Sequence, residues 1–391
     1  MRRPGRRSAR GRTARESPRE LSLDGRPSPG QERFSVVLVY PATYPLAMSN
    51  LGFHAAFRAA RALPGVRVER AFWDRRGSGT SFESGLPLSS FDVVAFSTSF
   101  EDDFLRIPAM LDSGGVPVAS SECDEDPFVV MGGFCAALNP EPVAPFLDAV
   151  LIGDAPALMP GLVERLEATR GRPRRERLED LATLAGSYVP SLYEVLTDDG
   201  RVTGFRAEAD APLPVRPATP SNDLATSVIL SDAAHFEDMF LIETARGCAR
   251  GCRFCAAGSL GHPVRVHDAD RVIAAALDAL KHTKRIGLVS ASLADHPEIV
   301  AIATALVDAG AELNIASLRA ESVTPAIAEV LASAGTRTVT IAPEAGSDEL
   351  RRIIGKPTSV EALRRAASVL ADAGIPRLKL YFMVGLPGEQ E

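Results

Sequence analysis

The sequence has no apolar run approaching the roughly 20 residues that a membrane-spanning helix requires. The first 30 residues carry arginines where a secretory signal peptide would need an apolar core. These absences disfavour membrane and secreted classes, so we expect a cytoplasmic protein. With 46% hydrophobic residues among 391, the chain is long enough to bury the cores of two domains.

Cysteine is also scarce, with five residues in the whole chain. So few thiols exclude a disulfide scaffold, and their distribution is uneven. Cys123 and Cys135 stand alone, whereas Cys248, Cys252 and Cys255 crowd into "ARGCARGCRFCAAG". This crowding favours a reduced compartment and a metal site.

The net charge of −7 conceals a basic amino terminus. Residues 1–33 contain ten arginines against four acids, a local balance of +6, and they are rich in Pro, Gly and Ser. This composition predicts a disordered basic tail, with nucleic-acid contact or targeting as the alternatives.

Residues 34–170 alternate β-branched runs with amphipathic stretches. Strands are expected at "FSVVLVYP", "VRVERAFWD", "FDVVAFSTSF", "FVVMGG" and "DAVLIGD", and helices at 50–63, 103–111 and 156–167. Alternation of this kind predicts a doubly wound parallel α/β domain. Residues 171–236 are richer in proline and charge, and "YEVLTDDGRVTGF" predicts a β-hairpin that turns at Asp199-Gly200 within a connection between domains.

Residues 237–391 repeat strand then helix. The expected strands are 240–244, 285–291, 312–317, 337–342 and 377–384, and the expected helices are 269–281, 297–309, 324–334 and 360–373. Five such units predict a partial (βα)6-type barrel, in which working groups lie where strands end. Because "GLPGEQE" directly follows the fifth strand, we expect either a fragment or an unusually short barrel.

The spacing Cys-x3-Cys-x2-Cys places three thiols on a glycine-rich loop after the first strand of this second domain. Structural zinc sites and ferredoxin clusters normally use four protein ligands, so three leave one position vacant. An open position suits a catalytic centre. A zinc site completed by His262 or His267, or three unliganded thiols, are the alternatives.

With Phe254 between the last two cysteines, the motif resembles the signature of the radical S-adenosylmethionine (radical SAM) superfamily. This resemblance implies an enzyme with a 4Fe-4S cluster on Cys248, Cys252 and Cys255 that cleaves SAM to methionine and a 5′-deoxyadenosyl radical. It also implies a reductant such as flavodoxin or ferredoxin. The substrate stays open; methylthio transfer, methyl transfer or another radical modification, with RNA as one candidate substrate, are allowed. The alternative functions are a cobalamin-dependent radical SAM methyltransferase and a non-catalytic Fe-S- or zinc-binding protein with a degenerate barrel.

The resemblance assigns further SAM contacts to the strand ends. Ser290 and Ser292 replace the superfamily's Gly-Gly-Glu-like motif, and their hydroxyls or backbone carbonyls would accept the hydrogen bonds of the methionine amino group. The ribose, carboxylate and adenine contacts fall respectively on Ser317 and Glu344, on Arg319, and on Phe254 with Val384, Gly385, Leu386 and Pro387. Arg319 could instead form a surface ion pair with Glu321.

The first domain resembles the cobalamin-binding domains that precede some radical SAM cores. The Asp-x-His-x-x-Gly loop that supplies a cobalt ligand is absent, because His54 lies within a predicted helix without the preceding aspartate. Cobalamin is therefore a disfavoured cofactor, although it could bind without a protein ligand. Segments such as "TYPLAMSNLG" and "APEAGSDELRRIIGK" resemble an uncharacterised radical SAM family over residues 34–391.

Overall fold

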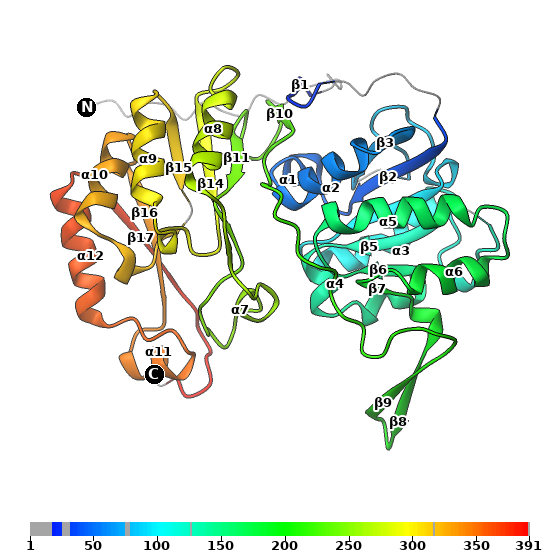
Figure 1. Ribbon diagram of the computed structural model, residues 1–391. Coiled ribbons are helices and arrows are strands. Elements are labelled where there is room, and N and C mark those ends of the chain that lie inside the picture. Colours follow the sequence, from blue (N-terminus) through cyan, green and yellow to red (C-terminus); the bar gives the residue numbers. More distant parts are fainter. Residues whose placement is uncertain (1–17, 26–31, 75–78, 126, 316, 390–391) are drawn as a thin grey trace.

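A computed structural model of the protein describes residues 18–25, 32–74, 79–125, 127–315 and 317–389. Two domains lie side by side, with the amino-terminal one built around a single sheet and the second around a curved row of strands and helices (Figure 1). Most of the tail that we predicted to be disordered, residues 1–17 and 26–31, lies outside the described ranges.

The N-terminal domain contains a six-stranded sheet. Its strands, in spatial order, are β3 (Val66–Phe72), β2 (Phe34–Tyr40), β4 (Val93–Ser97), β5 (Phe128–Gly132), β6 (Ala149–Leu151) and β7 (Ser187–Tyr188). All pairings are parallel except that of β7 with β6. The predicted doubly wound fold is confirmed, and the chain changes direction across the sheet between β2 and β4, the point where such sheets bind ligands.

Helices cover both faces of this sheet. One face packs against α2 (Leu51–Arg61), α5 (Ala155–Ala168) and α6 (Arg174–Ala182), and the other against α3 (Ile107–Ser113) and α4 (Phe134–Leu138). A short helix, α1 (Tyr44–Ala47), follows β2. In β4, Val93 and Ala95 enter the first apolar cluster while Val94 and Phe96 enter the second, because a parallel strand between two helical layers is buried on both sides.

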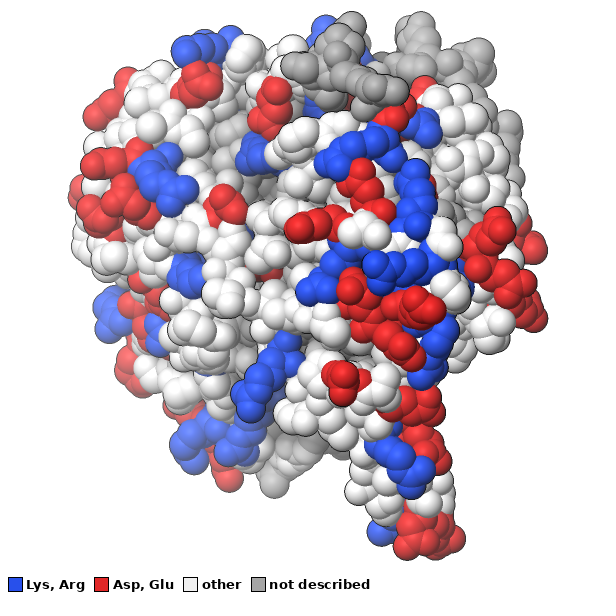
Figure 2. Space-filling model, turned by 45° about the vertical axis from the view of Figure 1, so that its right-hand side comes forward, with Lys and Arg blue, Asp and Glu red and all other residues white. Residues whose placement is uncertain are grey.

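The N-terminal domain extends further than the sequence indicated. We ended it at residue 170, yet α6 packs on the sheet and β7 joins its edge beyond that point. These elements escaped notice because β7 has only 2 residues and α6 is strongly charged. The predicted hairpin is present as β8 (Tyr193–Asp198) and β9 (Arg201–Ala207), and it stands out from the domain (Figures 1 and 2).

Part of the predicted tail is ordered. Residues Glu20–Ser22 form β1, which pairs antiparallel with β10 (Ile229–Ser231) in the segment between the domains. Glu20 accepts two hydrogen bonds from the buried guanidinium of Arg70, at 2.8 and 2.7 Å. The prediction of disorder was therefore wrong for these residues. Pairing with β10 and the hydrogen bonds from Arg70 to Glu20 hold them in place, and neither partner is close in the sequence.

The second domain has five parallel strands with helices between them. The strands are β11 (Phe240–Glu243), β14 (Arg285–Val289), β15 (Glu312–Ile315), β16 (Thr338–Glu344) and β17 (Arg377–Phe382). The helices are α7 (Ala257–Leu260), α8 (Ala269–Ala279), α9 (Ile299–Asp308), α10 (Pro325–Ser333), α11 (Asp348–Ile353) and α12 (Val360–Asp372). This is the predicted partial barrel, with element boundaries within a few residues of those expected.

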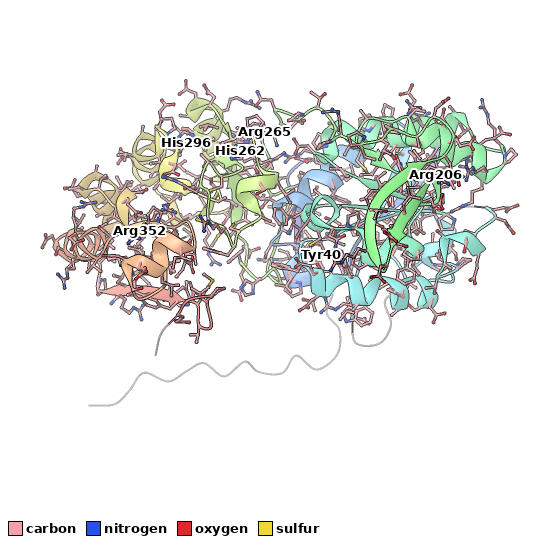
Figure 3. All side chains as sticks on the ribbon, turned by 90° about the horizontal axis from the view of Figure 1, so that it is seen from below. Tyr40, Arg206, His262, Arg265, His296 and Arg352 are labelled. Atoms are coloured by element: carbon pink, nitrogen blue, oxygen red, sulfur yellow. The ribbon has the colours of Figure 1, made fainter. Side chains whose placement is uncertain are left out.

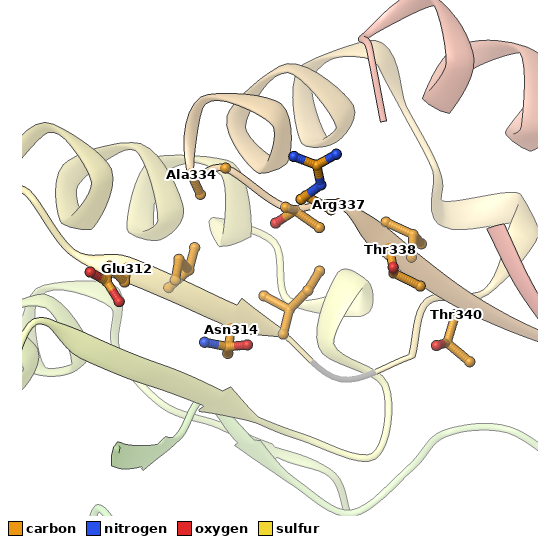
Figure 4. A pocket seen from close by; sticks show the side chains of 11 residues that line it. Glu312, Asn314, Ala334, Arg337, Thr338 and Thr340 are labelled. Atoms are coloured by element: carbon orange, nitrogen blue, oxygen red, sulfur yellow. The ribbon is translucent and has the colours of Figure 1, made fainter. Parts of the chain in front are cut away.

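The row of strands is interrupted in its middle. β11, β14 and β15 form one sheet and β16 and β17 another, and a single bridge between Leu318 and Ile341 joins them. A cavity of about 510 Å³ opens between β15 and β16 (Figure 4). Among the described residues, no helix combines the length and apolarity needed to cross a membrane.

Candidate metal centre

The three clustered cysteines lie on a loop that follows the first strand of the second domain. Residues 247–264 form this cysteine loop, and its two ends pair as β12 (Ala245–Arg246) and β13 (Arg265–Val266). Cys248 and Cys252 are half-buried, Cys255 is exposed, and all three are free thiols. The loop is thus closed at its base and presents its thiols at the carboxyl end of β11.

Glycine determines how the backbone of the cysteine loop packs. Gly247 has a φ of +92°, and a Cβ at this position would collide with the backbone oxygen of Gly261. Gly355, just after α11, has a φ of +73°, and a Cβ there would collide with the backbone oxygen of Gly251. Only glycine satisfies both the left-handed backbone and the close approach. The loop is therefore packed against itself and against the α11 region.

The cysteine loop offers three thiols as possible metal ligands, and the two histidines considered as a fourth zinc ligand differ in their surroundings. Within the described ranges, His, Cys, Asp and Glu side chains form no group of three or more at metal-binding spacing, so the thiols share a loop without converging. His267, one of two fourth zinc ligands considered, is buried with Nε2 at 3.1 Å from Glu243 Oε2. The other, His262, is exposed on the loop (Figure 3). Three thiols are a donor set that would leave one position of a 4Fe-4S cluster open to another ligand.

An ion pair joins the cysteine loop to the end of β14. Arg250 donates from Nε to Asp295 Oδ2 at 3.0 Å and from Nη2 to Oδ1 at 2.6 Å. Ser292 Oγ donates to the same carboxylate, and the backbone N–H of Ser292 donates to Ser290 Oγ at 3.2 Å. Burial tends to raise the pKa of Asp295, but the hydrogen bonds from Arg250 and Ser292 outweigh it and hold the pKa below its usual value.

Asp295 was missed by sequence reasoning, which examined the strand end only as far as Ser292. The one available signal was an acid shortly after the second strand, in "LVSASLAD". The structure brings this carboxylate, and both serines, to the side of the cysteine loop.

At the end of β15 lie Ser317, which is exposed, and Arg319. Arg319 Nε is 3.5 Å from Glu321 Oε2, so the ion pair considered as an alternative does form. That nitrogen is buried, and it makes no hydrogen bond among the described residues. The guanidinium therefore keeps donor capacity for a further acceptor, such as a carboxylate.

At the end of β16, Glu344 has a φ of +70° and accepts a hydrogen bond from Lys356 Nζ at 2.8 Å. Lys356 directly follows Gly355, which packs on the cysteine loop. Glu344 is therefore linked to that loop through its hydrogen bond with Lys356. Ser347 caps α11 by accepting from the Leu350 N–H at 3.1 Å.

After β17, the backbone N–H groups of Gly385 and Leu386 donate to Glu389 Oε2 at 2.6 and 3.0 Å. Leu386 packs on the apolar cluster of α11, while Val384 is 92% exposed. Phe254 is 44% exposed on the cysteine loop. The α11 region thus connects the end of the fifth strand to the cysteine loop.

Two family descriptions match the chain: "Radical SAM proteins, N-terminal" over residues 53–190 and "Radical SAM superfamily" over residues 242–391. This chain belongs to the radical SAM superfamily. The second match begins in β11 and includes the cysteine loop and every strand of the partial barrel.

An uncharacterised protein, MJ0966 of Methanocaldococcus jannaschii, is 24% identical to this radical SAM protein over 363 residues, which cover 91% of this chain and 71% of the relative. The solved structure of OxsB, a cobalamin-dependent S-adenosylmethionine radical enzyme with aqua-cobalamin bound, superposes with a TM-score of 0.59 at 16% identity. It matches 90% of this chain, which spans only 50% of the OxsB chain.

The radical SAM methyltransferase TsrM from Kitasatospora setae, with cobalamin and a [4Fe-4S] cluster bound, gives a TM-score of 0.57 at 15% identity. The match covers 91% of this chain and 67% of TsrM. The superpositions establish a shared fold.

In the N-terminal domain of this radical SAM protein, His54 is committed to structure. Its Nδ1 accepts from the Val228 N–H at 3.2 Å and its Nε2 lies 3.1 Å from the Met48 carbonyl oxygen. Burial is the main cause that lowers its pKa to about 4. Because both ring nitrogens are engaged, His54 is not available as a cobalt ligand.

Proposed function

We propose that this chain is a radical SAM enzyme whose cluster ligands are Cys248, Cys252 and Cys255. The observation that carries the proposal is the cysteine loop, closed at its base and holding three free thiols at the carboxyl end of the first barrel strand. Held by Cys248, Cys252 and Cys255, a 4Fe-4S cluster would leave one iron for SAM and would pass on the electron that cleaves SAM to methionine and a 5′-deoxyadenosyl radical. The protein's task is to hold SAM and exclude water.

Residues around the loop would hold the polar ends of SAM. Arg319, with a buried Nε that lacks a hydrogen bond among the described residues, suits the methionine carboxylate. The ionised Asp295, at the strand end where the Gly-Gly-Glu-like motif is replaced by serines, supplies a carboxylate for the amino group. Ser317 and Glu344 would meet the ribose. Phe254 and the turn 384–387 would line the adenine.

The proposal is tested by anaerobic reconstitution with iron and sulfide, followed by reduction in the presence of SAM and assay of 5′-deoxyadenosine. We expect product from the wild type, and none above background from Cys252→Ala. Cys123→Ala is the matched control, because Cys123 is buried in the N-terminal domain. A Cys252→Ala protein as active as the wild type would refute the assignment.

The SAM contacts have their own test. Arg319→Gln should raise the KM for SAM about tenfold with a smaller change in kcat, because a charge-assisted hydrogen bond contributes about 1.5–3 kcal/mol. Arg364→Gln on the exposed side of α12 should leave KM unchanged. An unchanged KM in Arg319→Gln would confine that arginine to its ion pair with Glu321.

A second candidate is a cobalamin-dependent radical SAM methyltransferase. Exposed apolar side chains gather on three successive loops at the carboxyl ends of β2, β4 and β5: Leu46, Phe100, Leu105, Phe134 and Leu138. Helices α1 and α4 in this set lie on the side of the domain that faces the barrel (Figure 1). This edge would accept a large planar ligand beside the cysteine loop.

The two candidates differ in one spectrum. Incubation with aquocobalamin and removal of free ligand should leave a corrinoid absorption band if the second candidate is correct. Phe134→Glu should then abolish it, while Phe205→Glu on the distant hairpin should not. For either candidate, a flavodoxin or ferredoxin would be the electron donor, and RNA is one substrate class to assay.

A further inference from the structure

Asp154 of the N-terminal domain does not cap the helix that it precedes. Asp154 stands at the N-cap of α5, where an aspartate normally accepts a hydrogen bond from its own helix, yet its side chain makes no such bond. Instead Asp154 Oδ2 accepts from the backbone N–H of Ser221 at 2.9 Å. The remaining contacts of this carboxylate reach into the second domain.

The partners of Asp154 are two arginines at the base of the cysteine loop. Arg246 Nη1 lies 2.8 Å from Asp154 Oδ1. Arg265 donates to both carboxylate oxygens, from Nη2 to Oδ1 at 3.3 Å and from Nη1 to Oδ2. Arg265 is labelled in Figure 3, on the part of the barrel next to the N-terminal domain. The side chain of Asp154 retains only 14% of its exposure, so solvent screens these pairs weakly.

The two arginines are opposite one another in the ribbon that closes the loop. Arg246 in β12 and Arg265 in β13 are Cα partners in register. Like charges directly opposite in an antiparallel pair are destabilising. One of them, Arg246, is also paired with Glu243, from Nε and Nη2 at 2.9 and 2.6 Å. Among the described residues, Asp154 is the carboxylate that forms ion pairs with both arginines at once.

We propose that Asp154 is a positioning residue for the cysteine loop: the N-terminal domain uses its carboxylate to hold the two ends of that loop together through Arg246 and Arg265. Arg246 stands two positions before Cys248, so the clamp sets the point from which the first thiol leaves the ribbon. That this loop carries a cluster rests on the proposed function; that Asp154 closes its base does not.

The first test uses the cluster-free protein and amide hydrogen exchange. Asp154→Asn keeps the size of the side chain and removes its charge. Peptides covering 247–264 should exchange at least fivefold faster in this variant, because the opposed arginines are no longer bridged. Asp180→Asn is the control, since Asp180 pairs with Arg165 at 3.2 Å within the N-terminal domain. Exchange in 247–264 that equals the wild type in Asp154→Asn would overturn the proposal.

A second variant guards against a general loss of folding. Arg265→Gln removes the β13 partner of Asp154 without changing any residue of the N-terminal domain, so it should speed exchange in the same peptides. Faster exchange spread evenly over both domains would instead mark Asp154 as a general stability residue and overturn the positioning role.

The reconstituted protein gives an independent readout. Iron should be lost to a chelator at least threefold faster from Asp154→Asn than from the wild type, and the electron paramagnetic resonance signal of the reduced cluster should broaden. Equal loss rates and signals would contradict the positioning role. A wild type that takes up no cluster would refute the proposed function, while the exchange experiment would still decide the role of Asp154.

Discussion

The two domains differ in how completely their sheets are closed. In the N-terminal domain six strands form one continuous sheet, and the strands β4 and β5 are buried along nearly their whole length. In the barrel the five parallel strands divide into groups of three and two, and all 6 residues of β17 are exposed. The first domain thus carries its own core, whereas the second leaves strand edges and faces open.

The difference indicates where each domain draws its stability. Two large apolar clusters, one on each face, support the N-terminal sheet. The barrel is divided among smaller clusters, and its cysteine loop is anchored by arginine pairs and close glycine contacts. Substitutions in the first domain should therefore act on global unfolding, and those in the second on local order.

The largest expected effect comes from the buried charge of the N-terminal domain. Arg70 is 2% exposed and is held by Glu20 and Glu83. Arg70→Met should destabilise this domain by about 3–5 kcal/mol, because it leaves carboxylates without their buried partner. Trp73, the single tryptophan, packs against the second apolar cluster. Its fluorescence therefore reports the urea unfolding of this domain alone.

The matched control for Arg70 is Arg206→Met on the hairpin. Arg206 pairs with Glu194 at 2.6 Å, but the two side chains are 65% and 53% exposed. Exposed pairs contribute about 0–1 kcal/mol, so this variant should unfold like the wild type. Equal losses in the two variants would mean that burial does not decide the effect.

The next effect depends on pH and again belongs to the first domain. His54, whose pKa burial lowers to about 4, is neutral in both states above pH 6.5. Between pH 6.5 and 4 the unfolded chain binds a proton that the folded domain does not, so stability should fall by about 3 kcal/mol. His54→Gln should remove this component. Urea midpoints from Trp73 fluorescence at pH 7 and pH 4.5 measure this loss of stability in both proteins. An equal change with pH in the wild type and in His54→Gln would contradict the prediction.

Sequence patterns predicted most of this fold because both domains are made of regular βα units. The apolar runs at β2 and β4 and the helix at α8 were found within a few residues. What they missed was non-local or weakly patterned: β1 pairs with β10, which lies far along the chain, and β7 is a 2-residue edge strand.

At the candidate site, the three cysteines were evident from their spacing, but the groups that anchor them were not. Asp295 and Asp154 lie in separate loops, and only the folded chain brings them to Arg250 and Arg246. An acid at a loop end is too common a feature to be read as a partner from sequence alone.

A smaller, local effect should follow from glycine in the barrel. Gly247→Ala adds a Cβ at a φ of +92° against the backbone oxygen of Gly261, which should cost about 1–3 kcal/mol of local strain. Iron uptake on reconstitution should fall while the Trp73 transition stays in place. Gly251→Ala is the control, because a Cβ there meets nothing within 4 Å. A shifted Trp73 transition in Gly247→Ala would show that strain in the cysteine loop also destabilises the N-terminal domain, contrary to the prediction.

The smallest effect is expected on the open face of β17. Leu380 is 44% exposed, so Leu380→Ala should change the free energy of unfolding by less than about 0.5 kcal/mol. Leu38→Ala in β2 removes the same atoms from a side chain that is 2% exposed, and it should destabilise by about 2–5 kcal/mol. Urea unfolding followed by far-ultraviolet circular dichroism compares the two. A loss above about 1 kcal/mol for Leu380→Ala would show that another surface covers β17 in solution, and the contrast between a closed and an open domain would then fail.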